Sequence, residues 1–127
     1  MSGIKYLLDT NIILGIVAGN SNAGIKLKGI DLENCAFSSV TRMELLGFPN
    51  ITQDEIKIIS TLLELMTQLT INRAIEDKTI NLKQQHRIKL PDAIILATAL
   101  THQVELLTLD KKLANKLQSI TQSRLSG

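Results

Sequence analysis

The sequence predicts an α/β fold in which helices cover both faces of a parallel sheet. Short apolar runs of strand character alternate along the chain with longer segments whose apolar residues recur at helical spacing. Glycine and proline punctuate several of the boundaries between them. With 127 residues and a hydrophobic content of 44%, the chain can build the core of a single domain, which we expect to span residues 1–127.

Each expected element has a local reason. Apolar residues 4–8 end at Asp9, and helical spacing follows as far as Val17, which indicates a strand, a tight turn and a helix. A weak helical segment is expected near 23–29, and a second short strand at 35–38.

The middle of the chain is expected to be mostly helical. A short helix at 41–47 is stopped by Gly47 and Pro49. Thr52 and Glu55 have the spacing of a capping box, which opens the next helix.

The C-terminal part continues the alternation. A brief strand near 68–71 leads into a polar helix from 73 to about 87, and Pro91 is expected at the first position of a mostly buried helix. A strand at 104–108 and a helix at 110–117 follow. The tail, 119–127, either adds one edge strand or is loose, so the sheet should have four to five strands.

The charge is unevenly distributed. The net charge of +2 combines six basic against nine acidic residues in 1–77 with eight basic against three acidic residues in 78–127. The C-terminal part can therefore present a basic surface to a polyanion, or simply a solubilising face. Aromatic residues are scarce, so nucleic-acid binding would depend on backbone charge more than on base stacking.

Cysteine content and hydropathy restrict the class of protein. The single cysteine, Cys35, excludes an internal disulfide and a zinc site built on cysteines. No apolar run approaches the ~20 residues of a membrane span, and MSGIKYLLD shows no secretory signal. We therefore expect a cytoplasmic protein without membrane association.

Four carboxylates interrupt or adjoin apolar runs: Asp9, Glu44, Asp92 and Asp110. A lone ionised carboxylate beside a core costs several kcal/mol, roughly, unless something compensates it. Open parallel sheets bind ligands at the carboxyl ends of their strands, and all four acids can converge at that edge. A hard divalent cation, which prefers oxygen ligands, would compensate them together. This pattern favours metal-assisted phosphodiester chemistry.

Each acid also has a purely structural explanation. Asp9 and Asp110 can cap the helices that follow them, and Asp92 lies in a first helical turn, where negative charge is favoured. Thr41 and Glu44 have the spacing of a second capping box, which would explain Glu44 without any metal. The joint placement of the four acids, more than any one of them, supports a site.

Four segments, LLDTNIIL, SSVTRMELL, KLPDAIILATAL and LLTLD, resemble in order and spacing the PIN domain family. More narrowly, they resemble the VapC-type toxins of bacterial toxin–antitoxin pairs, over about residues 4–113. The resemblance implies a three-layer α/β/α sandwich, an Mg²⁺- or Mn²⁺-dependent endoribonuclease, a homodimer, and a small antitoxin that blocks the site. The family often carries an Asp-Phe pair shortly after the fourth acid, where this chain has Leu113-Ala114.

By position, the resemblance assigns the acidic cluster to Asp9, Glu44, Asp92 and Asp110. It assigns the polar positions that line the cluster to Thr10, Asn11, Ser39 and Thr108. Our hypothesis places Asp9 and Asp92 on the main ion, Asp110 on the same ion or a second one, and Glu44 as general base or holder of a water molecule. Candidates for holding the RNA backbone are Arg42, Arg87, Lys89, Lys111 and Lys112.

Two other functions remain open at this point. A non-catalytic interaction module could keep the fold and use its acidic edge for a partner. A signalling receiver domain also has acids at strand ends, but it requires paired acids early in the chain, and Asp9 has no acidic neighbour. His86 and His102 are expected at the surface or in packing, and Cys35 in the core.

Overall fold

The computed structural model describes residues 3–126 of the chain, and side chains as far as residue 122. Within this range the strands are β1 (Tyr6–Leu8), β2 (Cys35–Ser38), β3 (Thr67–Leu69) and β4 (Glu105–Leu107). The helices are α1 (Thr10–Ala18), α2 (Ser21–Lys26), α3 (Ser39–Leu46), α4 (Gln53–Glu64), α5 (Arg73–Gln85), α6 (Leu90–His102) and α7 (Lys111–Ser126), with a 3₁₀ turn at Leu32–Asn34.

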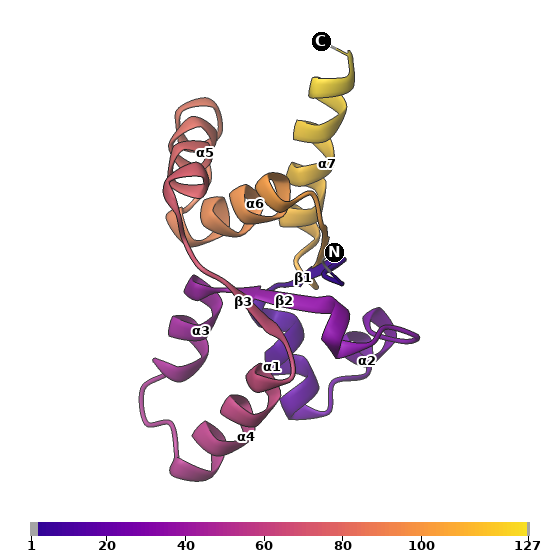
Figure 1. The fold of residues 1–127 in the computed structure, drawn as a ribbon, viewed down its shortest axis with the longest axis vertical. Helices are drawn as coiled ribbons and strands as arrows, with labels where there is room; N and C mark the ends of the chain where they lie inside the picture. Colours follow the sequence, from indigo (N-terminus) through magenta and orange to yellow (C-terminus); the bar gives the residue numbers. More distant parts are fainter. Residues whose placement is uncertain (1–2, 127) are drawn as a thin grey trace.

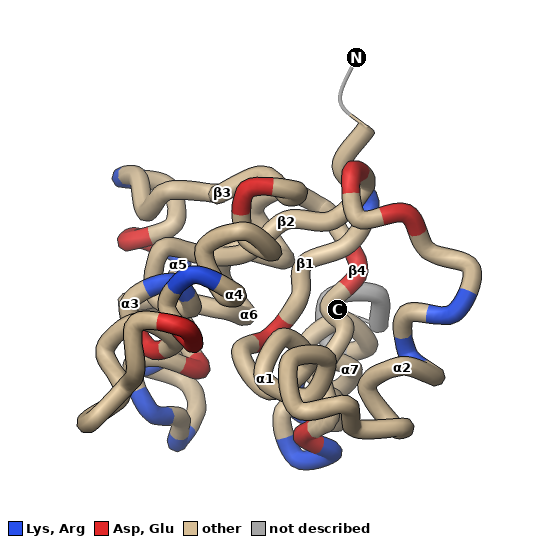
Figure 2. The backbone as a smooth tube through the Cα atoms, turned by 90° about the horizontal axis from the view of Figure 1, so that it is seen from below, with Lys and Arg blue, Asp and Glu red and all other residues tan. Residues whose placement is uncertain are grey.

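The four strands form one parallel sheet in the order β3-β2-β1-β4, which Figure 2 shows side by side. Tyr6 of β1 is paired with Cys35 of β2 and with Glu105 of β4. The backbone N–H of Asp9 donates to the carbonyl of Leu107 at 2.9 Å, one residue beyond β1. The carboxyl ends of the strands therefore meet at one edge of the sheet, as the sequence predicts.

Helices cover both faces of the sheet, which confirms the three-layer α/β/α architecture (Figure 1). Helices α5, α6 and α7 lie on one face, and α1 to α4 lie on the other. Successive strand residues point to opposite faces, so Leu7 and Ala36 join the core under α5–α7, whereas Leu8 and Phe37 join the core above α1 and α4. Packing in these two apolar cores thus fixes the position of the sheet edge at which the acids lie.

Helix α6 is buried along most of its length, as expected from its apolar sequence. Its buried residues run from Ala93 to Ala99 with one exception, Ile94. The hydroxyl of Thr98 donates to the carbonyl of Ile94 at 2.7 Å, so this buried polar group is satisfied within the helix. Within residues 3–126, none of the helices is long and apolar enough to cross a membrane.

The C-terminal tail differs from the expectation of an edge strand. Helix α7 does not end near residue 117 but continues to Ser126, and the sheet has four strands. Leu113 and Ile120 are buried, and Leu117 lies against the same core. Spacings of three and four residues place these side chains on one helical face, and packing of that face extends the helix. Residue 127 lies outside the described residues.

Two helix starts differ from the sequence prediction. Helix α3 begins at Ser39, earlier than expected, because Ser38 is its N-cap and accepts a 3.1 Å hydrogen bond from the N–H of Val40. Helix α6 begins at Leu90, so Pro91 is its second residue. The capping box of Thr52 and Glu55 is confirmed at the start of α4.

Candidate functional site

Asp9 lies between β1 and α1, and only 7% of its surface is exposed. Its Oδ1 accepts a 2.7 Å hydrogen bond from the backbone N–H of Thr10. Its Oδ2 accepts a 2.7 Å hydrogen bond from the hydroxyl of Thr108. Asp9 therefore caps α1, as the structural explanation requires, and at the same time faces the end of β4.

Asn11 and Thr108 join α1 to the loop that follows β4. The amide nitrogen of Asn11 lies 3.3 Å from the Thr108 hydroxyl and 3.4 Å from Oδ2 of Asp9. Its amide oxygen accepts a 3.0 Å hydrogen bond from the N–H of Leu109. These contacts bring three of the residues assigned by resemblance into one polar network.

Asp110 is fixed by the same network and by its own helix. Its N–H donates to the hydroxyl of Thr108 at 3.0 Å. Its Oδ1 accepts from the N–H groups of Lys112 and Leu113, at 2.9 and 3.2 Å, so it caps α7. Among residues 3–126, no hydrogen bond occupies its second oxygen, Oδ2. The cap and a ligand role are therefore compatible, because they use different oxygens.

Glu44 does not form the capping box that its spacing with Thr41 suggests, and that interpretation is wrong. Helix α3 starts before Thr41, so Thr41 is fully buried within the helix and does not cap it. The Oε1 atom of Glu44 instead accepts a 2.7 Å hydrogen bond from the hydroxyl of Thr10, which is also 3.1 Å from the hydroxyl of Thr41. Glu44 is directed toward the start of α1.

Asp92 occupies the first turn of α6 and is half-buried. Within the described part of the chain, its carboxylate has neither a hydrogen bond nor an ion pair. The negative charge is favoured by the helix terminus, and within residues 3–126 no side chain contacts the carboxylate as a hydrogen-bond or ion-pair partner. Asp92 is therefore left with an unoccupied carboxylate in this part of the chain.

The four carboxylates are close enough to influence one another electrostatically. Burial is the largest effect on Asp9 and raises its pKa, hydrogen bonds from Thr108 and Thr10 oppose this, and the charges of Glu44 and Asp110 raise the pKa further. Burial likewise raises the pKa of Asp92, and the charges of Asp9, Asp110 and Glu44 add to it, whereas Lys89 lowers it. The site is a concentration of negative charge at the sheet edge.

The four acidic side chains nevertheless do not form a compact group of metal ligands. Across residues 3–126, no three Asp, Glu, His or Cys side chains converge closely enough to form a ready group of metal ligands. All the candidate donors are oxygens, which suit a hard cation such as Mg²⁺. Mg²⁺ usually keeps several waters and uses one or two carboxylates, so it does not require three converging side chains.

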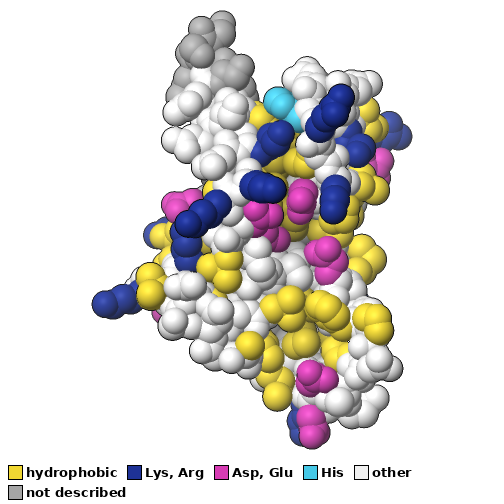
Figure 3. Space-filling model, turned by 180° about the vertical axis from the view of Figure 1, so that it is seen from behind, with side chains coloured by type: hydrophobic (Ala, Val, Ile, Leu, Met, Phe, Trp, Pro, Cys, Tyr) yellow, Lys and Arg dark blue, Asp and Glu magenta, His cyan; other side chains and the backbone are white. Residues whose placement is uncertain are grey.

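A cleft beside the acids carries the basic residues. It has a volume of about 620 Å³, and its lining includes Asp92 and Asp110. The basic residues that line it are Arg87, Lys89, Lys112 and Lys116. Figure 3 shows acidic side chains near the middle of one face, with basic side chains over the half above them and hydrophobic ones over the half below. Cations therefore border the acids mainly on one side.

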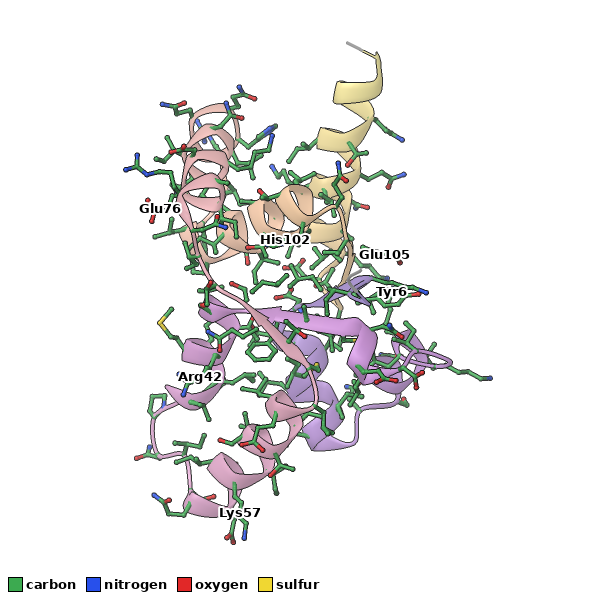
Figure 4. The ribbon with its side chains drawn as sticks, viewed as in Figure 1. Tyr6, Arg42, Lys57, Glu76, His102 and Glu105 are labelled. Carbon is green, nitrogen blue, oxygen red and sulfur yellow. The ribbon has the colours of Figure 1, made fainter. Side chains whose placement is uncertain are left out.

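The remaining sequence candidates lie elsewhere. Ser39 accepts a 3.0 Å hydrogen bond from Gln68 of β3, and no hydrogen bond links it to the acids among the described residues. Arg42 lines a separate pocket against Gln68 and α4. In Figure 4, Arg42 lies on α3, whereas Tyr6 and Glu105 lie side by side at the opposite end of the sheet. Glu105 is thus outside the site.

Three residues of α7 beyond Lys112 also line this cleft and are not among the site residues predicted from the sequence. Asn115, Lys116 and Ser119 line the same cleft. Their spacing from Lys112 by three, four and seven residues places all of them on one helical face, and this periodicity was the available signal. Ser119 lies beyond residue 117, the expected end of this helix, whereas Asn115 and Lys116 lie within it.

Comparison with known families settles the class of protein. A model of the PIN domain matches residues 6–116. The chain belongs to the PIN domain family. This assignment replaces the receiver-domain interpretation. Among proteins with curated descriptions, none matches this PIN domain chain.

Solved structures agree with the PIN fold. A structure described as a toxin–antitoxin complex from Klebsiella pneumoniae is 32% identical, covers 85% of this chain and 88% of its own, and has a TM-score of 0.75. VapBC-1 from nontypeable Haemophilus influenzae is 26% identical, with 91% and 94% coverage and a TM-score of 0.70. FitAcB from Neisseria gonorrhoeae is 22% identical, with 89% and 93% coverage and a TM-score of 0.74, which supports the fold alone.

Proposed function

We propose that this PIN domain protein is a metal-dependent endoribonuclease and the toxin of a toxin–antitoxin pair. The observation that carries the proposal is the set of four carboxylates at the carboxyl edge of the sheet. Asp9 and Asp110 precede α1 and α7, Glu44 lies on α3, Asp92 lies on α6, and they lie within electrostatic reach of one another. Burial first, and then repulsion from the other acids, raises the pKa values of Asp9 and Asp92, so their ionised forms are disfavoured at this site. A divalent cation bound among these acids would neutralise their charge and serve a metal-dependent enzyme.

Asp92, Asp9 and Asp110 are the residues that would hold the cation. Asp92 has no competing hydrogen bond, and Asp110 keeps Oδ2 free, in the described part of the chain. Both oxygens of Asp9 already accept hydrogen bonds. Oδ2 accepts from Thr108 and Asn11, whereas Oδ1 accepts from Thr10 alone and retains a further lone pair for a cation. When bound, Mg²⁺ or Mn²⁺ would supply Lewis-acid neutralisation of the charge that develops on the scissile phosphate.

Glu44 is the residue that would accept the proton of the attacking water. The Thr10 hydroxyl holds Oε1, so Oε2 stays available, and the side chain is exposed to solvent. The water oxygen would form a new bond to phosphorus as its proton passes to Glu44. The P–O bond to the leaving oxygen would break, and that oxygen would keep the electron pair of the bond and take a proton from solvent. Proton transfer to a positioned carboxylate contributes typically ~10²- to 10⁴-fold to a rate.

The antitoxin of this pair would cover the apolar surface beside the acids. Met43 and Phe48 are 57% and 48% exposed, and Met43 directly precedes Glu44. Exposed apolar patches on soluble proteins mark sites of association. A small antitoxin bound there would close access to Glu44. The similar structures from Klebsiella pneumoniae and Haemophilus influenzae support this proposal, the first being described as a toxin–antitoxin complex. We further propose that the toxin forms a homodimer.

The decisive experiment is an RNA cleavage assay with purified protein. We expect cleavage with Mg²⁺ or Mn²⁺, none with excess chelator, and a large loss in Asp9→Asn and Asp92→Asn. The matched control is Asp54→Asn, because Asp54 is also an acid in a first helical turn but lies on α4, where it is exposed. Full activity in both site variants would show that these acids do not perform the reaction.

A thermal denaturation series separates metal binding from catalysis. Adding Mg²⁺ or Mn²⁺ should raise the Tm of the wild-type protein and of Asp54→Asn, and should raise it much less in Asp92→Asn. A ligand at 100 times its Kd stabilises the native state by about 2.7 kcal/mol. Equal stabilisation of wild type and Asp92→Asn would place the cation elsewhere.

The alternative function is a non-catalytic PIN-fold module that binds a partner through its acidic edge. It predicts no cleavage of RNA and little stabilisation by either cation. The same two assays distinguish it from the nuclease, and a protein that fails both would be assigned to this alternative.

A further inference from the structure

We infer that a polar groove between α5 and α7 is the track along which an RNA strand reaches the carboxylates. The cleft of about 620 Å³ beside Asp92 and Asp110 shares Ser119 with a second cavity of about 270 Å³. The second cavity is lined from α5 and the loop after it by Lys78, Asn81 and Gln85, among others. Figure 1 shows α5 and α7 rising on either side of α6. Together the two cavities form the α5–α7 groove.

The charge of the groove suits a chain of phosphates. Its lower part carries four cations, contributed by the α5–α6 loop and by α7, against the two acids. Its upper part adds Lys78 without an acid. Lys89 is the one basic residue whose charge opposes the rise in the pKa of Asp92, so this cation lies within electrostatic reach of the proposed reaction centre. Negative charge at one end and positive charge along the rest would position one phosphate at the acids and its neighbours in the groove.

The basic residues line both sides of the groove, in an arrangement that can follow the phosphates of an RNA strand. Lys112 and Lys116 are one helical turn apart on α7, with Asn115 and Ser119 on the same face. Arg87 and Lys89 face them from the loop between α5 and α6. The guanidinium of arginine can bind a phosphate with two parallel hydrogen bonds, and lysine acts as a point charge. An RNA strand in the groove would therefore be bound by α7 on one side and by the α5–α6 loop on the other.

The loop that carries two of these cations is braced. Lys83 of α5 donates from Nζ to the carbonyl of Ile88 at 2.9 Å. Ile88 lies between Arg87 and Lys89 and packs against the core. The loop therefore presents its cations from a fixed backbone, which lowers the cost of ordering them when RNA binds.

The kinds of side chain that line the groove predict which contacts supply its affinity for RNA. The chain has no tryptophan, one tyrosine and two phenylalanines, and none of these lines either cavity. Affinity should therefore come from phosphate contacts and be steeply dependent on salt, with amide side chains such as Asn81 and Asn115 available to base edges. This inference rests on the proposed function, because it places the scissile phosphate at the carboxylates.

The test is RNA binding without cleavage. A fluorescent single-stranded RNA of about 12 nucleotides, within the range of known site sizes, is titrated in excess chelator at several salt concentrations. The variants are the pair Arg87→Ala with Lys89→Ala and the pair Lys112→Ala with Lys116→Ala. The control is Lys26→Ala with Lys28→Ala, which removes the same charge from exposed residues at the end of α2. Circular dichroism and sedimentation check fold and mass.

Each phosphate contact contributes about −0.7 to the slope of log affinity against log salt for single strands. We expect each groove pair to reduce the magnitude of the slope by about 1.4, so that raising salt from about 50 to 200 mM costs wild type about sevenfold more affinity than the variant. The control pair should match wild type. Unchanged slopes in both groove pairs would overturn the inference. So would a change in sedimentation mass with an unchanged slope, because the groove would then be a contact between two copies.

The experiments distinguish a refuted RNA-binding groove from a refuted nuclease function. In chelator, Asp92→Asn should bind the RNA at least as tightly as wild type, because it removes a negative charge near the phosphates. Undiminished cleavage by Asp92→Asn would refute the proposed reaction and leave the binding slopes standing. Salt slopes equal to wild type in both groove pairs, together with cleavage that depends on Asp92, would refute RNA binding in the groove and leave the proposed nuclease function standing.

Discussion

The hydroxyl of Thr108 donates a 2.7 Å hydrogen bond to Oδ2 of Asp9, although the two residues are 99 positions apart. The same hydroxyl accepts the N–H of Asp110 at 3.0 Å. One buried oxygen thus connects the ends of the two neighbouring strands β1 and β4 and the acids that follow each of them. The relative position of Asp9 and Asp110 depends on this contact.

Replacing Thr108 by valine should weaken both the fold and the site. Valine has nearly the same shape but cannot hydrogen-bond, so the Asp110 N–H loses its partner, at a cost of about 1–3 kcal/mol in unfolding free energy. The hydrogen bond from Thr108 lowers the pKa of Asp9, so its loss should raise that pKa and move the acidic limb of the pH–rate profile to higher pH. Urea denaturation and cleavage rates measure the two effects. Thr108→Ser should retain both properties, and a Thr108→Val protein identical to wild type would contradict the role assigned to this hydroxyl.

Replacing Thr10 should reduce activity through the orientation of Glu44. The Thr10 hydroxyl bonds Oε1 of Glu44 at 2.7 Å and lies 3.1 Å from the hydroxyl of Thr41. Thr10→Val removes both contacts, and losing a residue that orients a reacting group lowers activity typically ~10- to 100-fold. Cleavage rates with saturating Mg²⁺ measure the loss.

Three further variants test whether Thr10 acts through Glu44. Thr10→Ser keeps the hydroxyl and should recover most of the activity. Glu44→Gln should lose at least as much activity as Thr10→Val, whereas Glu64→Gln, an exposed acid on α4, should lose none. An active Glu44→Gln protein would argue against Glu44 as the proton acceptor.

The sequence predicts the layers of this fold well because each apolar segment is locally unambiguous. The alternation of strand and helix is confirmed, including the parallel sheet covered on both faces. The capping box of Thr52 and Glu55 is also confirmed, since both partners lie within one helical turn. The capping box depends on residues close in the chain, and the strand or helix character of each apolar segment likewise follows from its own residues.

The errors occur where distant contacts override local patterns. Thr41 and Glu44 have the same spacing as that capping box, but burial of Thr41 against α1 and the hydroxyl of Thr10 place Glu44 differently. The length of α7 depends on packing of Ile120 against the core of α5 and α6. The cleft between α5 and α7 could not be foreseen, because it needs both helix lengths and their separation.

Gly15 should be required where α1 and α2 meet. A Cβ atom at Gly15 would lie 2.6 Å from the Cβ of Ala23, which is fully buried on α2. Gly15→Ala forces the helices apart, and overpacking of this kind costs typically about 1–3 kcal/mol. Gly24→Ala is the matched control, since it lies in α2 with nothing within 4 Å, and alanine should stabilise the helix by up to ~1 kcal/mol. Equal Tm values for the two variants would contradict the close approach.

The raised pKa of Asp92 predicts a pH-dependent stability that Asp92→Asn should remove. Burial is the main cause of the shift, followed by the charges of Asp9 and Asp110. A raised pKa means that the native state holds the proton more tightly than the unfolded chain does. In chelator, the contribution of Asp92 to stability is therefore greatest below its ordinary pKa of 3.8 and is lost as the pH rises through the raised pKa.

In chelator at neutral pH, the Asp92→Asn protein should therefore be more stable than wild type, and the difference should close as the pH falls below 3.8. Asp54→Asn also removes an acid from a first helical turn, so it reports the loss of the helix-terminus interaction alone, worth about 0.3–1 kcal/mol. Urea denaturation of the three proteins across this pH range gives the two differences. A wild-type protein more stable than Asp92→Asn at neutral pH in chelator would mean that the carboxylate is compensated within the chain, and the charge argument for a cation at this edge would fail.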